Sequence, residues 1–263
     1  MLATFVGCAG VGKNTVIQEI IKTHPDRYEN FPTLTTREMR QGESQGNPYI
    51  FMSKEEFERL LDEGEIYEWQ KIHNGQYYGG SRKVLREHLA SGRTLVKDID
   101  VLGAKTYKEK LSDITKILSV FLYVDSFETL IERMRGRGDE PDDIEARAGR
   151  FHMEMAESVD CDYMVNNIEV AASAAATECL LRCEEAGETH YHCAAGCTAD
   201  EEEIADQIER SKNGERLEGV ILTYNGTELL ITEGAARYEA AKRENAFIQK
   251  IIATLPDYDL KRA

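Results

Sequence analysis

The feature that most constrains this chain lies at its beginning, where a short apolar segment leads into a glycine-rich segment. The apolar segment is Leu2-Ala3-Thr4-Phe5-Val6, and the sequence Gly7-Cys8-Ala9-Gly10-Val11-Gly12-Lys13-Asn14-Thr15 follows it. The first predicts a strand and residues 16–23 predict a helix, so the glycines fall at a strand-to-helix turn. In such a turn backbone N–H groups and the helix N-terminus converge on an anion, and Lys13 adds a positive charge. The pattern predicts a phosphate-binding loop for a nucleotide.

One position of this loop departs from the usual signature. The residue after the lysine is normally a serine or threonine whose hydroxyl binds Mg²⁺, and here it is Asn14. The first hydroxyl belongs to Thr15, which we expect to take over the contact with Mg²⁺. A glycine-rich turn with an incidental lysine is the alternative interpretation.

Composition excludes several classes of protein. With 263 residues, of which 41% are hydrophobic, the chain can bury the core of one large domain, or of a medium and a small one. We expect no membrane segment and no signal peptide, because no apolar stretch is long enough and no charged leader precedes the first strand. The net charge of −16 argues against nucleic acid as a partner. Six cysteines without a disulfide-like spacing favour the reducing cytoplasm.

Alternating helices and strands are expected over residues 1–187. Expected helices cover 16–23, 54–63, 83–90, 103–110, 126–135, 144–157 and 169–185, and expected strands cover 32–36, 49–52, 66–69, 94–99, 118–124 and 163–166. Residues 116–124 are nearly all apolar, which is typical of a parallel strand covered on both faces. This order predicts an α/β fold.

Residues 188–263 have a different character, and we expect a second, small α+β domain there. Thr198-Ala199-Asp200-Glu201 resembles a capping box before a helix at 200–211. Two strand-like runs, 220–224 and 227–231, flank Asn225-Gly226, a strong hairpin signal. A helix is expected at 235–245, and an apolar run follows at 247–255.

Arginines, tyrosines and carboxylates form an ordered set behind the loop. Two arginines three residues apart and two separated tyrosines can together hold one phosphate dianion. The set comprises Thr33, Arg37, Arg40, Tyr49, Glu68, Tyr78, Asp98, Asp100, Arg133, Arg137, Arg147 and Asn166. In order and spacing it resembles the guanylate kinase family, over residues 2–185. Each residue taken alone has a plain structural interpretation, as a surface charge or a sheet-face aromatic.

The resemblance implies a P-loop nucleoside monophosphate kinase fold with a parallel sheet, an NMP-binding subdomain and a lid subdomain. It implies that Arg37, Arg40, Tyr49 and Tyr78 hold the phosphate of GMP or dGMP, that Thr33 and Glu68 recognise guanine, and that Asn166 contacts the adenine of ATP. Asp98 and Asp100 match positions that organise magnesium and the guanosine. Arg133, Arg137 and Arg147 match lid arginines that close on the transferred phosphoryl group. The implied reaction is in-line transfer from ATP with Mg²⁺, and nothing after Gly187 is needed for it.

Departures from the family pattern leave the acceptor open. Gly80 stands where the family usually has a serine or threonine of the guanine pocket, Lys97 replaces an apolar residue, and Leu102 replaces a glutamine. A kinase for a modified nucleotide is therefore one alternative, and an inactive guanylate-kinase-like interaction module is another. Retention of Lys13, Asp98 and the lid arginines argues against the second.

The C-terminal region offers two further candidates. Cys179 and Cys183 share a helix face, and Cys193 and Cys197 repeat their spacing, so four thiolates could hold a structural Zn²⁺; unligated cysteines or a disulfide are the alternatives. The C-terminal tail, about residues 198–257, is similar to the ParB/sulfiredoxin-like domain, which carries a Gly-x-x-Arg at a helix start after a hairpin. The segment from Gly234 to Arg237 has this motif. It could bind an anion, or Arg237 could pair with Glu233.

Overall fold

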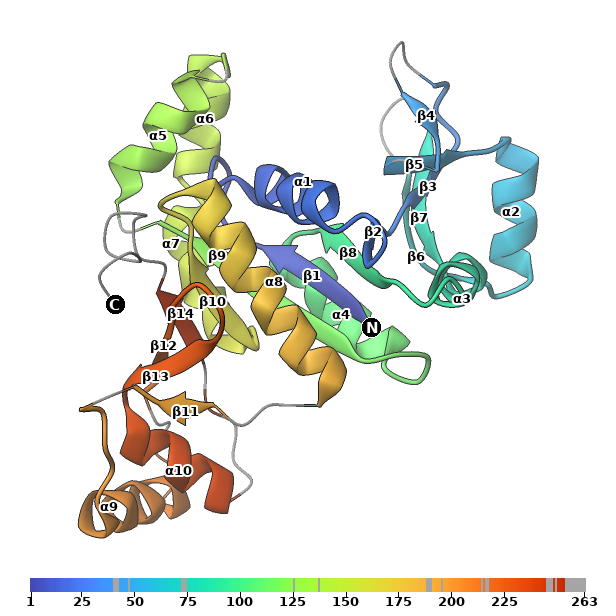
Figure 1. Cartoon of the computed structure of the whole chain (residues 1–263). Helices are drawn as coiled ribbons and strands as arrows, with labels where there is room; N and C mark the ends of the chain where they lie inside the picture. Colours follow the sequence, from blue (N-terminus) through green and yellow to red (C-terminus); the bar gives the residue numbers. More distant parts are fainter. Residues whose placement is uncertain are drawn as a thin grey trace. The chain divides into compact units, whose positions relative to one another are not determined.

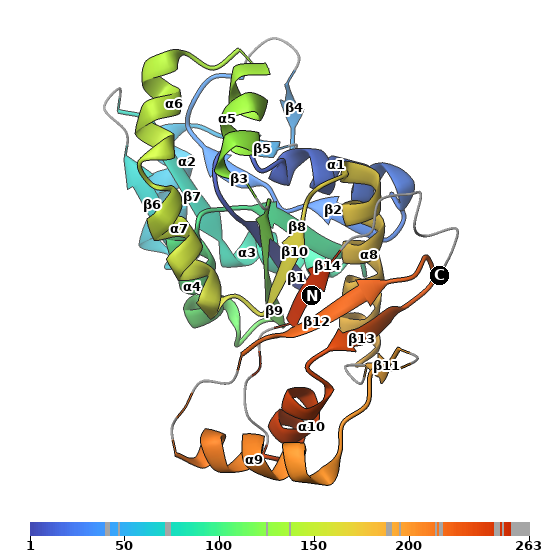
Figure 2. The same cartoon turned by 90° about the vertical axis from the view of Figure 1, so that its left-hand side faces the viewer.

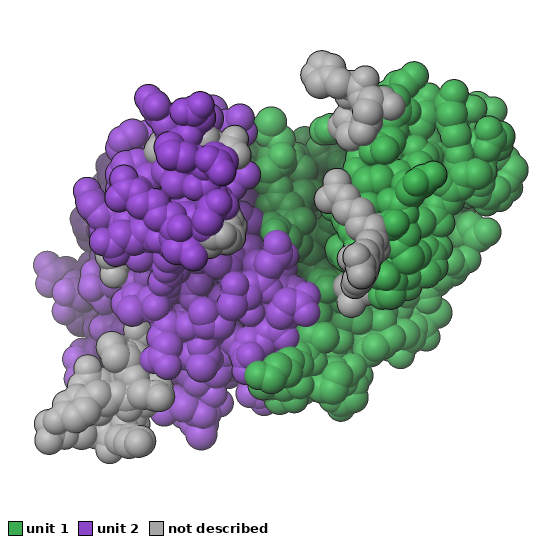
Figure 3. Space-filling model, turned by 90° about the horizontal axis from the view of Figure 1, so that it is seen from above, with its two compact units in different colours: residues 1–5, 21–118 green, residues 6–20, 119–263 purple. Residues whose placement is uncertain are grey.

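The computed structural model describes residues 1–39, 43–46, 48–71, 75–124, 126–136, 138–187, 191–194, 196–213, 215, 218–244, 248 and 250–253. Two compact units make up the chain, residues 1–5 and 21–118 in one and residues 6–20 and 119–263 in the other, coloured green and purple in Figure 3. Among the described residues, no helix combines the length and the apolar character that crossing a bilayer requires.

The first unit contains a parallel group of three strands. β8 (Thr94–Asp98) lies between β1 (Leu2–Val6) and β2 (Tyr28–Asn30). Every residue of β1 is buried, as its apolar sequence predicts. α4 (Val101–Leu111) follows β8 directly and begins at Asp100, whose side chain accepts a hydrogen bond from the Gly103 N–H. This cap places residues 98–103 at the carboxyl end of β8.

A second sheet in the first unit has five strands in the order β4-β5-β3-β7-β6. These are β3 (Thr33–Thr35), β4 (Ser44–Gln45), β5 (Pro48–Phe51), β6 (Ile66–Lys71) and β7 (Tyr77–Ser81). α2 (Lys54–Asp62) packs on this sheet through Phe57, which stacks on Tyr77 at 5.2 Å, and α3 (Arg82–Leu89) follows β7 (Figure 1). The sheet brings Thr33, Glu68 and Tyr78 onto neighbouring strands.

The second unit contains a mixed sheet in the order β9-β10-β14-β12-β13-β11. Its strands are β9 (Ile117–Tyr123), β10 (Tyr163–Asn166), β11 (His192–Cys193), β12 (Val220–Tyr224), β13 (Leu229–Glu233) and β14 (Lys250–Ala253). β14 runs parallel to both of its neighbours, β10 and β12 (Figures 1 and 2). β14 is thus an inner strand of this sheet.

The helices of the second unit follow the expected positions with one exception. They are α1 (Lys13–Thr23, which continues into the first unit), α5 (Phe127–Gly136), α6 (Pro141–Ala148), α7 (Phe151–Glu157), the 3₁₀ turn η1 (Ser158–Asp160), α8 (Val170–Ala186), α9 (Glu201–Lys212) and α10 (Ala235–Arg243). The single helix expected at 144–157 is wrong. The chain makes a tight turn there, in which the Arg150 N–H bonds to the Arg147 carbonyl, and two helices result.

The alternating order of the α/β fold and the hairpin at Asn225-Gly226 are both confirmed. The capping box expected at Thr198 is wrong by two residues, because the Asp200 side chain accepts from the Glu203 N–H and caps α9. The separate domain expected at residues 188–263 stays a prediction. In the structure β12, β13 and β14 extend the sheet of β9 and β10 within one compact unit.

Candidate active site

The glycine-rich loop between β1 and α1 is packed too closely for side chains. Gly7 has φ 140°, and a Cβ there would lie 2.3 Å from the Leu122 carbonyl oxygen. Gly12 has φ 96°, and a Cβ there would lie 2.8 Å from Asn167 Nδ2. Both positions therefore require glycine on conformational and steric grounds. The loop leads with glycine at both positions into the N-terminus of α1, as a phosphate-binding loop requires.

Lys13 begins α1 and reaches back across the loop. Its Nζ donates to the Gly7 carbonyl oxygen at 2.7 Å. The side chains of Asn14 and Thr15 are exposed in the first turn of the helix. The Thr15 hydroxyl is an oxygen ligand of the type that Mg²⁺ takes, so the loop fits the ion despite Asn14.

Two side chains from distant segments fix the loop from the other side. Arg133, on α5, donates to the Val11 carbonyl at 3.2 Å and to the Asn167 carbonyl at 2.9 Å. Asn167 is fully buried, and its Nδ2 donates to the same Val11 carbonyl at 2.6 Å. Burial lowers the pKa of Arg133. Arg133 thus supports the backbone of the loop in this structure.

The base of the loop also contains a buried thiol. Cys8 is 4% exposed, and burial together with the nearby Glu154 carboxylate raises its pKa to about 12. The thiol is therefore protonated at neutral pH, so Cys8 is a packing residue of the loop.

In the first unit, Arg37 lies in an aromatic and acidic setting. Its guanidinium donates to both carboxylate oxygens of Glu43, at 2.9 and 2.7 Å, and lies 5.3 Å from the ring centres of Tyr49 and Phe51. Tyr49 in turn meets Tyr78 edge-to-face at 6.0 Å. The residues predicted for phosphate binding are thus brought together, apart from Arg40, which lies outside the described residues.

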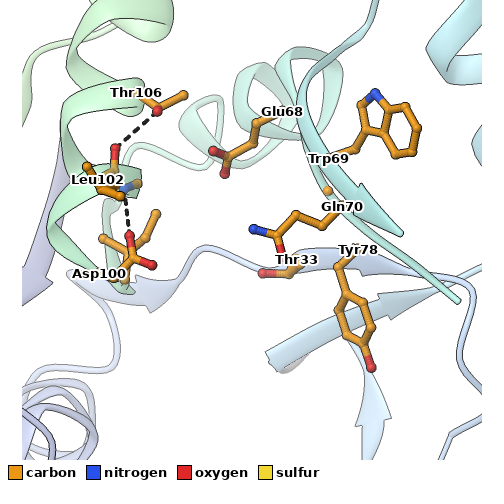
Figure 4. A pocket seen from close by; sticks show the side chains of 11 residues that line it. Thr33, Glu68, Trp69, Gln70, Tyr78, Asp100, Leu102 and Thr106 are labelled. Carbon is orange, nitrogen blue, oxygen red and sulfur yellow. Dashed lines mark hydrogen bonds between the residues drawn. The ribbon is translucent and has the colours of Figure 1, made fainter. Parts of the chain in front are cut away.

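A cavity of about 390 Å³ opens between the five-stranded sheet and α4. It is lined by Thr33, Glu68, Trp69, Gln70, Tyr78, Gly79, Ile99, Asp100, Leu102, Gly103 and Thr106. In Figure 4 the Glu68, Gln70 and Thr33 side chains point toward a common space, while the Trp69 ring points away from it. Acceptors and donors therefore surround a space of the size of a small planar ligand.

Glu68 is the acceptor on the sheet side of this cavity. Burial raises its pKa, while a hydrogen bond from Tyr107 and the charge of Lys97 act in the opposite direction. Opposite it, one Asp100 oxygen accepts the Gly103 N–H at 2.7 Å, so that oxygen is committed to capping α4.

Lys97 lies on β8, behind the wall of the cavity. Its Nζ donates to the Phe31 carbonyl at 2.9 Å and to Thr33 Oγ1. Burial lowers its pKa to about 8, against the attraction of Glu68 and Asp98.

The departure at Gly80 has a steric explanation. A Cβ on Gly80 would lie 2.0 Å from Tyr67 Oη, on the adjacent strand, and Tyr67 is only 6% exposed. The phenol of Tyr67 therefore occupies the space that a side chain at position 80 would need.

Comparisons with known proteins decide the family. The guanylate kinase family model matches residues 2–182. The chain belongs to the guanylate kinase family. It is 38% identical over 175 residues to the guanylate kinase of Idiomarina loihiensis. The aligned region covers 66% of this chain and 81% of that protein. It is 36% identical over 179 residues to that of Photorhabdus laumondii, covering 67% and 84%. A solved guanylate kinase from Anaplasma phagocytophilum is 26% identical, covers 70% of this chain and 85% of that one, and has a TM-score of 0.49.

The resemblance to the guanylate kinase family also assigned roles to residues whose contacts in the structure do not test those roles. Asn166, expected to contact adenine, is buried at 8% exposure. Arg147 forms an ion pair with Asp139 at 2.9 Å and is 43% exposed. Asp98 lies half-buried at the end of β8, where it attracts Lys97. Arg137 lies outside the described residues. The roles of these residues stay predictions.

Sequence reasoning missed Asn167 and the layer behind the pocket of this guanylate kinase family member. Asn167 is adjacent to the predicted Asn166, and only the fold shows which amide reaches the loop. Lys97 had a signal, since it breaks the apolar pattern of its strand, but its contact with Thr33 depends on how β3 lies against β8.

The zinc site expected at Cys179, Cys183, Cys193 and Cys197 is not supported. Across the described part of the chain, no three or more histidine, cysteine or acidic side chains gather as a metal site, and all six cysteines are free. The thiols interact within the pairs 179/183 and 193/197. The structure favours the alternative of unligated cysteines. Likewise Arg237 lies 3.6 Å from Glu233 and from Glu218, as its plain interpretation predicted.

Proposed function

We propose that this member of the guanylate kinase family phosphorylates GMP or dGMP with ATP, giving the nucleoside diphosphate. The observation that carries the proposal is the Glu68 carboxylate pointing into the cavity beside Thr33 (Figure 4). A carboxylate can accept from both the N1–H and the exocyclic amine of guanine, whereas adenine presents an acceptor at N1. The acceptor pocket therefore favours guanine.

The proposed reaction needs no protein nucleophile. A phosphate oxygen of GMP attacks the γ-phosphorus of ATP in line, and ADP leaves. Lys13 and the loop amides hold the phosphates of ATP, and Arg37 with Tyr49 and Tyr78 orients the phosphate of GMP. Mg²⁺, held through Thr15, would neutralise phosphate charge when bound. Arg40, Arg133, Arg137, Arg147, Asp98, Asp100 and Asn166 keep the roles that the family resemblance implies.

The alternatives are weaker on this structure. An interaction module would not need glycines that close packing and φ both require, nor Lys13 held across the loop. The alternative of a kinase for a modified nucleotide rests on the altered pocket at Gly80 and Lys97 alone. Six free cysteines support a reducing compartment such as the cytoplasm.

The test is ADP release with GMP, dGMP, AMP, CMP and UMP as acceptors. We expect turnover with the two guanine nucleotides and little with the others. Glu68→Gln should lower kcat/KM for GMP, because the amide NH₂ faces one of the two guanine donors, with a loss of up to roughly 10⁴ in discrimination. Glu65→Gln, one residue before β6 and outside the cavity lining, is the matched control. Turnover of another base alone would refute the substrate assignment.

A further inference from the structure

Lys97 is a part-buried charge next to the acceptor pocket, and the proposed reaction leaves it without a role. It lies on β8, one residue before Asp98, and it is absent from the side chains that line the cavity. Its ammonium reaches the cavity wall from behind, through Thr33 Oγ1, and also donates to the Phe31 carbonyl at 2.9 Å. Any influence of Lys97 on a bound base must therefore pass through another residue.

The contact with Thr33 fixes the polarity of the threonine hydroxyl. An ammonium group has three N–H donors and no lone pair, so Thr33 Oγ1 must be the acceptor in this hydrogen bond. The single hydroxyl proton of Thr33 then points elsewhere. Because Thr33 lines the cavity, that proton is available as a donor to a ligand. Without Lys97 the hydroxyl could rotate and act as donor or acceptor.

The same ammonium acts on Glu68. Its positive charge lowers the pKa of the Glu68 carboxyl, against the burial that raises it. The ionised carboxylate is acceptor-only. Thr33 is thus a fixed donor and Glu68 a fixed acceptor, and both line the same cavity. Lys97 acts on both of them from behind the cavity wall.

We propose that Lys97 is a positioning residue that determines base specificity, by holding the Thr33 hydroxyl as a donor beside the Glu68 acceptor. The inference rests on the proposed function, since it concerns the base of the acceptor nucleotide. A pocket with this polarity takes a purine that presents donors to Glu68 and a carbonyl or ring-nitrogen acceptor to Thr33. A 2-amino-6-oxopurine presents both, and a 6-aminopurine presents an acceptor where Glu68 needs a donor.

A purely structural role does not account for a lysine here. Lys97 packs against the Phe31 ring, with Nζ 5.8 Å from the ring centre, and an uncharged chain of equal length would fill the same space. Replacing a buried charge by an apolar residue of similar volume is often neutral or stabilising. The Lys97 ammonium therefore fixes the direction of the Thr33 hydrogen bond, and its removal from water costs free energy of desolvation.

The test compares kcat/KM for GMP and for AMP in the full chain, with Lys97→Met as the main variant. We expect the preference for GMP to fall about tenfold, mainly through a higher KM for GMP with kcat little changed, as the loss of one oriented hydrogen bond implies. Lys110→Met is the matched control. Lys110 also carries positive charge near Glu68 but bonds to the Tyr67 carbonyl, so its loss should leave the preference within twofold, roughly the reach of a partly solvated charge.

A double-mutant cycle with Thr33→Val separates the proposed route from a general effect of charge. If Lys97 acts through Thr33, Lys97→Met changes the preference by no more than the twofold allowed for Lys110→Met once Thr33 is valine. An undiminished effect in that background, or an equal effect of Lys110→Met, overturns the inference. Should Lys97→Met fail to fold, Thr33→Ser must keep the preference and Thr33→Val must lower it; equal values overturn the inference.

Different results would refute the proposed function and the proposed role of Lys97. A wild-type protein that does not phosphorylate GMP refutes the proposed function. A wild-type protein that prefers GMP, with a Lys97→Met variant that prefers it equally, refutes the role of Lys97 alone.

Discussion

Among single residues, Lys13 carries the charge that the glycine loop directs at a nucleotide. Lys13→Ala should lower kcat by about 10² or more, because the lost charge acts on phosphate oxygens that gain charge during transfer. The melting temperature should stay near the wild-type value, because Lys13 is only half-buried and its Nζ bonds to a loop carbonyl, that of Gly7.

The control for Lys13→Ala is Lys22→Ala, in the last turn of the same helix. It removes an equal charge from an exposed position, and kcat should not change. If Lys13→Ala kept near-normal kcat, the glycine loop would not be the ATP site.

Lys97 also has a consequence for stability at the residue scale. Its pKa falls from 10.5 to about 8 on folding. Between these values the unfolded chain binds more protons than the folded one, so stability rises with pH through this window. Relative to Lys97→Met, the wild type should gain about 1–3 kcal/mol between pH 7.5 and pH 10.

Urea denaturation of both proteins at several pH values measures this difference directly. Titrating groups that the charge of Lys97 does not reach contribute equally to the two proteins and cancel. Parallel stability curves across the window would show that Lys97 is not buried as a charge.

At the scale of elements, β6 and β7 are adapted to each other through Tyr67 and Gly80. Gly80→Ser should destabilise the protein by about 2 kcal/mol or more, because the new Cβ would fall 2.0 Å from Tyr67 Oη. Tyr67→Leu in the same chain should restore most of that loss. A double-mutant cycle by thermal unfolding gives the coupling, and additive effects would contradict the steric explanation.

Local signals predicted most elements well, because they lie in the sequence itself. The apolar run of β9, the hairpin at Asn225-Gly226 and the helix after the glycine loop all appear where expected. The break between α6 and α7 was missed, since helix periodicity continues across Gly149 and only the packed chain shows the turn. Pairing of β14 with β10 was missed for another reason: strand partners far apart in sequence leave no local pattern.

The sequence predicted which residues form the site, but not the hydrogen bonds and ion pairs that they make. Thr33, Glu68 and Tyr78 meet around one cavity as the family order implied. The ion pair of Arg37 with Glu43, and the contact of Lys97 with Thr33, depend on the tertiary placement of flexible side chains. Spacing in sequence does not determine such contacts.

At the scale of the whole molecule, the C-terminal region is joined to the kinase sheet by β14. Removing residues 188–263 would expose the edge of β10 and the buried ring of Tyr163, over which Lys250 lies at 4.9 Å. We expect a lower melting temperature and a tendency to aggregate. The loop and the acceptor pocket precede the cut, so kcat per folded molecule should stay within a few-fold.

Ile252→Ala is the matched point variant for this deletion. Ile252 is fully buried on β14 and pairs with Val165, so its truncation should cost about 2–4 kcal/mol without changing kcat. A well-folded deletion that no longer transfers phosphate to GMP would show that the C-terminal region contributes to the reaction.

The inner position of β14 also sets an order for biosynthesis. β10 and β12 leave the ribosome before β14, which must then enter between them. Until residues 250–253 emerge, two strand edges stay open to other chains. Completion of this sheet therefore waits for β14, and pulse-labelled hydrogen exchange should find β10 and β12 amides protected in the same phase as those of β14. We therefore expect a nascent chain of this protein to need a chaperone most just before β14 emerges.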